Sequence, residues 1–512
     1  MAPQSSPQRR WPAFPPFFAF FAIFALLGTL WSLATPIFAS PDESAHATKA
    51  VAQLRGEFAG YEREGVRFPV IDLPNSYRYS EGIVCFVPHP AVPANCGVEL
   101  GAPDGTPWFG NWVLSYNPLY YYVVGWPTLF LDGNTGVYAM RILSALLGAV
   151  LLSLACQSAL SRGSRRWMPL ALAFLASPMV LFLSGSVNPQ GVEITAGALS
   201  WIAIIRLFES YRDSGHVRSW RLWAPVVVGA LFLIEARAVG PLWWLIIAAV
   251  ALGVVGFGAI RTALADRRAW PWMGAVLIFA AFSAYWTLKG GSVSGQAAQG
   301  DAPHVGGSPI DGFWATLRNT PTYVEQAIGL FGWLDTPLPG LVLGLYLAAV
   351  FVVVLFALLA TGRRGGTLTA VTLGVAALVP PLVQAAAVSR TGVIWQGRYS
   401  LFLYLGIVIV ACWSLSRRGD PRIDFLSIPV TAIISGVLGV YGIAAFVLAL
   451  RRYVVGNDTP ITGMVHAPLW QPPFGWPVLV VLFVAVTAVF TGVIAVAARR
   501  AADQPLTAHS ES

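Results

Sequence analysis

The sequence predicts an all-α, polytopic transmembrane protein, on the evidence of its composition and of the length of its apolar runs. Of its 512 residues, 56% are hydrophobic and only 11% are charged, and the mean hydropathy is +0.65. A soluble domain carries roughly 25% charged residues, so most of this surface is expected to face lipid. Apolar runs of about 20 residues recur from end to end, and such a run spans a hydrocarbon core of roughly 30 Å.

The first apolar run, residues 17–33, is expected to be a retained signal-anchor helix. Arg9 and Arg10 precede it, as in a signal peptide, but the run is long and aromatic and no A-x-A cleavage site follows it. The segment therefore predicts the first membrane span, with the N-terminus in the cytoplasm.

The arginine clusters predict the orientation of the later spans. They lie in alternate loops between the apolar runs, and cationic loops are retained on the cytoplasmic side of a membrane. Placing all of the clusters there gives about twelve spans, with both termini in the cytoplasm. The chain is then expected to be a multi-pass protein of the cell's inner (plasma) membrane. The clusters are Arg162–Arg166, Arg212–Arg221, Arg261–Arg268, Arg363–Arg364, Arg417–Arg422 and Arg499–Arg500.

This topology predicts one transmembrane domain over residues 1–500 and a short cytoplasmic tail at 501–512. Residues 37–137 then form a first long extracytoplasmic loop, and residues 288–336 form a second. The assignment requires that residues 115–131 do not cross the membrane. Two prolines and a short apolar core in that segment favour a re-entrant or interfacial helix.

Net charge and cysteine positions narrow the class further. The net charge is +8, but because the arginines are dispersed as topological signals, we expect no nucleic-acid partner. Cys85 and Cys96 lie in the first extracytoplasmic loop, where a disulfide between them is expected. Cys156 and Cys412 lie inside apolar spans and are expected to be small core residues.

The segment SPDESAHATKAVAQL directly follows the first span and carries the first candidate site. At helical spacing Asp42, His46, Lys49 and Gln53 share one face, and Ser40 or Asp42 can cap the helix. Asp42 or Glu43 is then a candidate general base at the membrane surface. Alternatively, the two carboxylates and His46 ligate a divalent cation. A third interpretation is an ordinary amphipathic helix that lies on the bilayer.

Further candidates lie at the outer ends of later spans. Arg398 in WQGRYS is flanked by Gln396 and Tyr399, and a guanidinium there suits a lipid phosphate, although a snorkelling arginine would look the same. Asp335 in GWLDTP is a candidate polar contact or a simple turn aspartate. Arg141 and Glu193 lie just inside spans, and Glu235 and Arg237 flank a turn; intramembrane charges are functional candidates, but pairing within the bundle explains them as well.

The sequence contains no motif of a nucleotide site. It has no P-loop, no glycine-rich dinucleotide fingerprint and no cysteine or histidine set with metal-ligand spacing. An enzyme of this kind would therefore need an activated donor delivered within the membrane.

Six short segments together resemble the bacterial membrane-protein family known as domain of unknown function 2142, which is related in architecture to the GT-C glycosyltransferases. They occur in order over most of the chain. They are PDESAH (41–46), YNPLYYYVVGWP (116–127), AMRILSALLG (139–148), SVNPQG (186–191), GLFGWLDTPLP (329–339) and WQGRYSLFLYLG (395–406).

The resemblance implies a GT-C-like enzyme that transfers a sugar from a polyprenyl-phosphate donor to a cell-envelope glycan, lipid or protein on the extracytoplasmic face. Asp42 and Glu43 match the acidic pair that supplies the catalytic base. Arg141 and Arg398 match basic residues near the donor phosphate. The implied substrate-binding residues are His46, Lys49, Tyr116, Asn117, Arg141, Asp335, Gln396, Arg398 and Tyr399. Trp112 and the tyrosines at 116 and 120–122 could supply a stacking surface, or belong to an aromatic belt.

The implied partners are membrane lipids, the lipid-linked sugar and its acceptor; no cofactor is expected with certainty, and a divalent cation is left open. Two other functions stay open. A transporter or flippase of lipid-linked saccharides would favour broken helices and charges at the midplane over a polar shelf beyond the first span. A scaffold for envelope assembly would tolerate the replacement of Asp42 without loss of activity.

Overall fold

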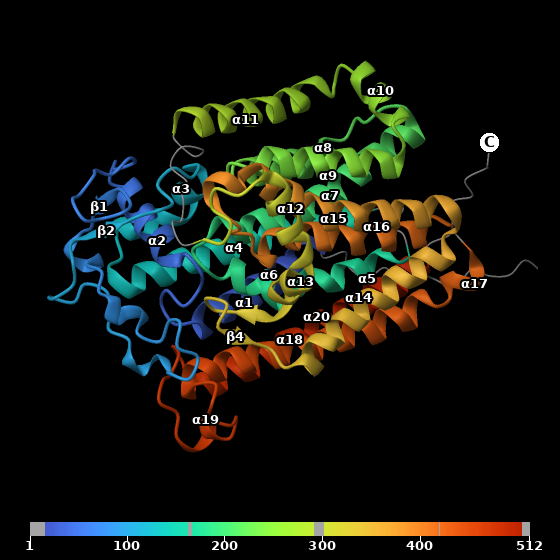
Figure 1. The fold of residues 1–512 in the computed structure, drawn as a ribbon. Helices are drawn as coiled ribbons and strands as arrows, with labels where there is room; N and C mark the ends of the chain where they lie inside the picture. The colour runs from blue at the N-terminus through green and yellow to red at the C-terminus, as the bar shows by residue number, and fades with distance from the viewer. Residues whose placement is uncertain (1–15, 162–165, 291–301, 419, 504–512) are drawn as a thin grey trace, which may run out of the picture.

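The computed structural model describes residues 16–161, 166–290, 302–418 and 420–503. These residues form a bundle of long helices with a smaller group of short elements at one end (Figure 1). The arginines at 9, 10, 162 and 165, and most of the predicted tail at 501–512, lie outside the described residues. The predicted all-α, polytopic fold class is confirmed.

Nine helices of the described residues are long and apolar enough to cross a membrane, and a bent pair of helices would make a tenth. The predicted count of twelve is therefore not confirmed. The nine are α1 (Pro16–Ala34), α4 (Gly133–Ala159), α7 (Pro189–Ser214), α11 (Trp270–Lys289), α14 (Gly340–Ala360), α15 (Gly362–Thr391), α16 (Leu401–Arg418), α18 (Ser427–Val455) and α20 (Trp476–Ala502).

The other expected spans fall on helices that are short or interrupted. The bent pair consists of α9 (Gly240–Val255) and α10 (Gly258–Ala265), which meet at 107°. The helix α8 (Trp220–Ile234) has 15 residues, which is short for a span. The helix is interrupted between α5 (Met168–Ala173) and α6 (Pro178–Ser184). Pro178 has no backbone N–H, so it cannot make the hydrogen bond that would continue the preceding helix.

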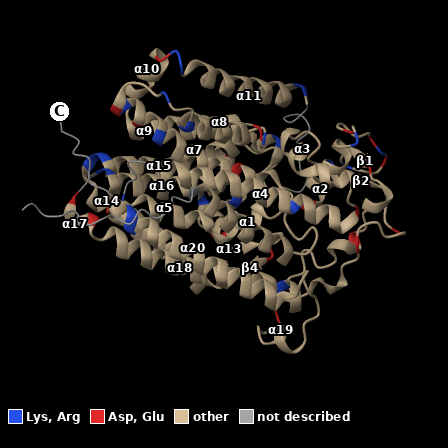
Figure 2. Cartoon of the chain, turned by 180° about the vertical axis from the view of Figure 1, so that it is seen from behind, with Lys and Arg blue, Asp and Glu red and all other residues tan. Residues whose placement is uncertain are grey.

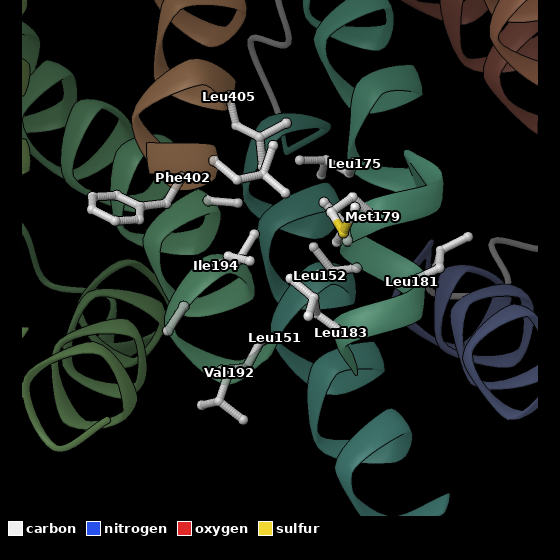
Figure 3. Packing of buried hydrophobic residues seen from close by; sticks show 14 of the residues in the cluster. Leu151, Leu152, Leu175, Met179, Leu181, Leu183, Val192, Ile194, Phe402 and Leu405 are labelled. Carbon is white, nitrogen blue, oxygen red and sulfur yellow. The ribbon is translucent and has the colours of Figure 1, made fainter. Parts of the chain in front are cut away.

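The centre of the bundle is α7, which packs against α4, α6, α8, α9 and α16. In the most apolar stretch of α7, 94% of the residues are buried within the protein. The corresponding share for α11 is 11%, and α11 lies on the outside of the bundle (Figure 1). Figure 3 shows part of the core around α7, with Leu151 and Leu152 from α4, Met179 from α6, Ile194 from α7 and Phe402 from α16 among the labelled residues. Charged residues gather at the two ends of the bundle and are few between them (Figure 2), which is the distribution that a membrane requires.

The loop after α1 folds into a small cap over one end of the bundle (Figure 1). It contains α2 (Glu43–Gln53) and two antiparallel strands, β1 (Val70–Asp72) and β2 (Trp108–Gly110). A disulfide joins Cys85 to Cys96, whose Cα atoms are 6.1 Å apart. Cys156 and Cys412 are buried free cysteines.

The segment at 115–131 forms two short helices rather than a span. They are α3 (Leu119–Gly125) and a 3-10 helix at Trp126–Leu129, and α3 packs on α2. The second long loop holds α12 (Pro309–Arg318), α13 (Thr320–Gly329) and the strand pair β3 (Leu330–Phe331) and β4 (Thr336–Pro337). Two short helices, α17 (Pro421–Asp424) and α19 (Gly463–His466), complete the fold.

The interpretation of α2 as an amphipathic helix lying on the bilayer is wrong. Every residue of α2 is buried, on its polar face as well as on its apolar one. Asp42 stands at the N-cap position, but its side chain makes no capping hydrogen bond. The polar side chains of this helix are therefore held inside the protein, where each needs a partner.

Candidate functional site

The turn that leads into α2 is held by segments from distant parts of the chain. The Trp333 indole donates a hydrogen bond to the carbonyl of Phe38 at 3.0 Å, and the Asn188 amide donates one to the carbonyl of Pro41, also at 3.0 Å. Phe38 and Asp42 both adopt left-handed backbone conformations, with φ of 61° and 59°. Such conformations persist where the surroundings impose them, and they concentrate at functional sites.

Both carboxylate oxygens of Glu43 accept hydrogen bonds that hold this turn. Its carboxylate accepts hydrogen bonds from Nε and Nη2 of Arg141, at 2.7 and 2.5 Å, and from the backbone N–H groups of Phe38 and Val187, at 3.1 and 2.9 Å. Both side chains of the pair are 0% exposed. Glu43 therefore fixes the backbone rather than facing a substrate.

The guanidinium of Arg141 is likewise hydrogen-bonded entirely within the protein. Its remaining N–H donors go to the carbonyls of Ser32, Thr35 and Pro36 at the end of α1, so all five donors of the guanidinium are in use. The expectations that Glu43 supplies the base and that Arg141 contacts substrate do not fit this geometry. Arg141 instead joins α4 to α1 and, through Glu43, sets the conformation of the turn.

Asp42, one residue earlier, has a different environment. One carboxylate oxygen accepts a hydrogen bond from Nη2 of Arg398 at 2.9 Å, and the other accepts one from the indole of Trp112 at 3.3 Å. The Asp42 side chain remains 29% exposed, whereas Arg398 is 4% exposed. Of the two adjacent carboxylates, Asp42 is thus the one that an incoming group can reach.

Arg398 is placed by a close approach of two backbones. Gly397 packs so tightly on α13 that a Cβ there would overlap the carbonyl oxygen of Tyr323, and its N–H donates to Oε1 of Gln326 at 2.8 Å. Within the described part of the chain, Nε of Arg398 and Oε1 of Gln396 are buried without a hydrogen-bond partner. Buried polar atoms normally have partners, so these two are available for a ligand.

A small hollow beside Arg398 has room for about one water molecule. Its walls are mostly apolar. Its lining includes Pro41, Phe182, Leu183, Gln326, Leu334 and Arg398.

The polar face of α2 lies beneath Asp42. His46 shares a hydrogen bond of 2.8 Å between its Nδ1 and the hydroxyl of Tyr121, and its ring packs edge-on against Tyr116. Burial lowers the pKa of His46 well below its ordinary value of 6.5, and the charges of Arg237, Lys49 and Arg398 act in the same direction. The imidazole is therefore neutral at neutral pH.

Lys49 is bound by backbone rather than left free for substrate. Its ammonium donates to the carbonyls of Val113 at 3.2 Å, Leu114 at 2.9 Å and Tyr116. It also lies 4.2 Å from the ring centroid of Tyr121. Burial lowers the pKa of Lys49 well below its ordinary value. Its role in this structure is to shape the turn that carries Trp112 and Tyr116.

A second arginine, Arg237, belongs to the same cluster. Its Nη2 donates to the Tyr116 hydroxyl at 3.2 Å, and its guanidinium lies 4.6 Å from the ring centroid of Tyr399. The guanidinium of Arg398 lies 5.4 Å from the same ring. Beneath it, Nη1 of Arg237 is 3.7 Å from a carboxylate oxygen of the buried Glu193. The sequence marked Arg237 only as one charge of a turn; its spacing to Arg398 in the chain gives no signal of this proximity.

Asn117 links the cap to the turn after α8. Its side-chain oxygen accepts the N–H of Leu119, which begins α3, and its amide donates to Oε2 of Glu235. Burial raises the pKa of Glu235 to about 7, and the hydrogen bond from Asn117 opposes this rise. Asn117 therefore acts as a structural connection in this fold, rather than as the substrate contact that was expected.

Asp335 forms a separate anchor. It accepts a hydrogen bond from Nη2 of Arg452 at 2.9 Å, and the same arginine donates to the carbonyls of Phe86, His89 and Val92 in the disulfide loop. The Arg452 side chain is 0% exposed. The expected substrate contact at Asp335 is thus replaced by a tie between α18 and the cap, and the sequence analysis had not singled out Arg452.

The described residues contain no group of three or more histidine, cysteine or acidic side chains that could hold a metal ion. The set proposed from sequence, Asp42, Glu43 and His46, does not converge. Glu43 turns toward Arg141, and Nδ1 of His46 toward Tyr121.

The model of a family described as "Predicted membrane protein (DUF2142)" matches residues 24–407. No match is found among curated proteins. Among solved structures, the chain is similar to the crystal structure of ArnT from Cupriavidus metallidurans bound to undecaprenyl phosphate, with a TM-score of 0.42 and 14% identity. The similarity covers 96% of this chain and 78% of that chain.

Proposed function

The chain belongs to the DUF2142 family of membrane proteins, and we propose that it is a glycosyltransferase that moves a sugar from a polyprenyl-phosphate donor to a hydroxyl group of an envelope acceptor. The observation that carries the proposal is the pair of Asp42 and Arg398. It combines a partly exposed carboxylate with a nearly buried guanidinium, 2.9 Å apart, at the end of a membrane bundle.

Asp42 is the base of the proposed reaction. The acceptor hydroxyl loses its proton to the Asp42 carboxylate while its oxygen bonds to the anomeric carbon of the sugar. The bond between that carbon and the phosphate oxygen breaks, and the polyprenyl phosphate leaves with the electron pair. A general base placed in this way contributes typically 10² to 10⁴ in rate.

Arg398 would stabilise the charge that develops on the leaving phosphate. Only Nη2 of its donors is used by Asp42, and Nε has no partner in the described residues. Arg237, whose guanidinium also lies against the Tyr399 ring, adds a second positive charge to the site. Preorganised donors of this kind act strongly where water is excluded.

Apolar side chains of α6 and of the strand-pair turn lie beside Arg398. They would contact the end of the isoprenoid nearest the phosphate, while Arg398 takes the phosphate itself. An isoprenoid in the bilayer and a phosphate at the end of the bundle also agree with the distribution of charge in Figure 2. On this account Asp42 faces the extracytoplasmic side of the inner (plasma) membrane, and both termini are cytoplasmic.

The experiment uses the purified full-length protein in nanodiscs, with a panel of radiolabelled polyprenyl-phosphate sugars and a membrane extract as the source of acceptor. Transfer of label to the extract by wild type, with loss of transfer in folded Asp42→Asn, supports the proposal. Donor binding without transfer, unchanged in Asp42→Asn and reduced in Arg398→Ala, would contradict it and would favour transport of lipid-linked saccharides.

A further inference from the structure

Trp112 is held in one position beside Asp42 by its neighbours in the chain. The amide of Asn111 donates to the carbonyl of Ala45 in α2 at 2.7 Å, and the backbone N–H of Asn111 donates to the carbonyl of Pro69 at 2.8 Å. The Asn111 side-chain oxygen also accepts the N–H of Val113. These bonds fix the backbone on both sides of Trp112, so that its indole N–H reaches Asp42 at 3.3 Å.

Trp112 belongs to an aromatic shelf, which we define as Phe68, Phe109 and Trp112. The ring centroids of Phe68 and Phe109 each lie 5.8 Å from that of Trp112. Phe109 is the buried member of the shelf, whereas Phe68 and Trp112 are partly exposed. The pairing of β1 with β2 supplies the backbone frame, because Phe109 lies in β2 opposite Ile71.

The rim of the aromatic shelf faces water rather than lipid. Arg67, next to Phe68, is exposed, and its guanidinium lies 5.4 Å from the ring centroid of Phe68. Charged side chains at the depth of lipid tails are costly. The shelf therefore does not suit an isoprenoid chain.

Asp42 thus separates two surfaces of opposite character. On the Arg398 side is the small apolar hollow, and on the Trp112 side is the water-facing aromatic shelf. Since a transferase must bring two substrates to one base, each surface corresponds to one of them. The donor phosphate is proposed to bind at Arg398, which leaves the aromatic shelf for the acceptor.

We infer that the aromatic shelf is the acceptor subsite, that it binds a saccharide whose ring stacks on Trp112, and that the acceptor is therefore a glycan rather than a protein or a simple lipid. This inference rests on the proposed function. The less polar face of a sugar ring packs on an aromatic ring, and stacking on Trp112 places a hydroxyl next to the carboxylate that Trp112 itself positions. Holding the nucleophile and the base at this distance supplies much of the rate advantage of such sites.

The test measures transfer by the full-length protein in nanodiscs with three acceptor fractions of the producing cell's envelope. These are oligosaccharides released by mild acid, a lipid extract and delipidated protein. The variants are Trp112→Ala and Trp112→Phe, with Trp126→Ala as a control because Trp126 is an exposed tryptophan, 50% exposed, on the 3-10 helix after α3. The readouts are the KM for acceptor, the KM for donor and the rate of donor hydrolysis without acceptor.

We expect the oligosaccharide fraction to accept the sugar. We expect Trp112→Ala to raise the KM for acceptor about tenfold, with a smaller rise for Trp112→Phe, because one stacked ring is lost or reduced. The KM for donor should stay near the wild-type and Trp126→Ala values. The rate of hydrolysis should fall less than the rate of transfer, because hydrolysis loses only the hydrogen bond from Trp112 to Asp42, whereas transfer also loses the stacked ring.

Three results would overturn the inference without touching the proposed function. The first is transfer only to lipid or protein. The second is an unchanged KM for acceptor in Trp112→Ala. The third is a parallel loss of hydrolysis and transfer, which would make Trp112 only a positioning residue for Asp42. Absence of both transfer and hydrolysis in wild type would instead refute the proposed function itself.

Discussion

Two adjacent carboxylates each pair with an arginine from a distant part of the chain, and the two pairs differ in nearly everything else. The pair of Glu43 and Arg141 is fully buried, and every donor and both acceptor oxygens are satisfied inside the protein. The pair of Asp42 and Arg398 is partly exposed and leaves Nε of Arg398 without a partner in the described residues. The first pair thus holds the turn, and the second is left open to a ligand.

The largest expected effect on stability comes from breaking the buried pair of Glu43 and Arg141. Arg141→Ala leaves the Glu43 carboxylate buried without its partner, so we expect the free energy of unfolding to fall by about 3–5 kcal/mol. A thermal melt in nanodiscs would show a markedly lower midpoint. The double variant Glu43→Gln with Arg141→Met is the matched control, because it buries no lone charge and should recover part of the loss. A wild-type melt for Arg141→Ala would show that the pair does not hold the turn.

The next effect concerns the open pair. Arg398→Ala should weaken the binding of polyprenyl phosphate by about tenfold to a hundredfold, since a charge-assisted hydrogen bond contributes roughly 1.5–3 kcal/mol. Stability should change little, because Asp42 can then be hydrated at its exposed side. Binding is measured by titration of nanodiscs with the lipid, and Arg390→Ala, on an exposed arginine at the end of α15, is the control. Equal binding by wild type and Arg398→Ala would remove the proposed phosphate contact.

Glu235, which accepts a hydrogen bond from Asn117 in the cap, gives a test of stability that changes neither ion pair. Its pKa is about 7 in the folded state and 4.5 as the ordinary value, so the folded state keeps a proton that the unfolded state has released between these pH values. Stability from this group is present below pH 4.5 and is lost as the pH rises through 7. Glu235→Gln, which stays neutral, should therefore stabilise the protein at pH 8 by about 1–3 kcal/mol and have little effect at pH 5. Melts at the two pH values measure this, and stabilisation at pH 5 alone would contradict the assignment.

The smallest effect concerns His46. Its pKa is lowered by burial, so the unfolded state takes up a proton first as the pH falls below 6.5. Stability from neutral His46 is full above that pH and is lost below it. The melting temperature of wild type should fall more steeply between pH 7 and pH 5.5 than that of His46→Gln. Identical slopes would mean that His46 titrates normally in the folded protein.

Sequence reasoning predicted local features better than distant pairings. The spacing of Asp42, His46 and Lys49 correctly placed a polar helix face after the first span, and residues 115–131 form short helices, as their two prolines predicted. The twelve-span count is not confirmed, because Pro178 interrupts one expected span and α8 is short. Hydropathy counts apolar length, and it does not register where a helix ends inside the bundle.

The roles within the site depend on contacts that no local pattern encodes. Glu43 and Arg141 are 98 residues apart in sequence, and Asp42 and Arg398 are 356 apart. The side chains of two adjacent residues point in different directions, so the two carboxylates contact different parts of the protein. Which arginine each one binds depends on the fold and cannot be deduced from the local sequence. Lys49 was expected at a substrate, but the carbonyls of the turn at 113–116 satisfy it first.

The most direct measurement compares Asp42→Asn and Glu43→Gln for both sugar transfer and thermal stability, at equal amounts of folded protein in nanodiscs. The account predicts opposite results. Asp42→Asn should melt near the wild-type temperature and lose transfer by about 10² to 10⁴, whereas Glu43→Gln should melt at a lower temperature and keep transfer in the fraction that remains folded. Loss of transfer in folded Glu43→Gln together with normal transfer by Asp42→Asn would contradict the division of roles between the two carboxylates.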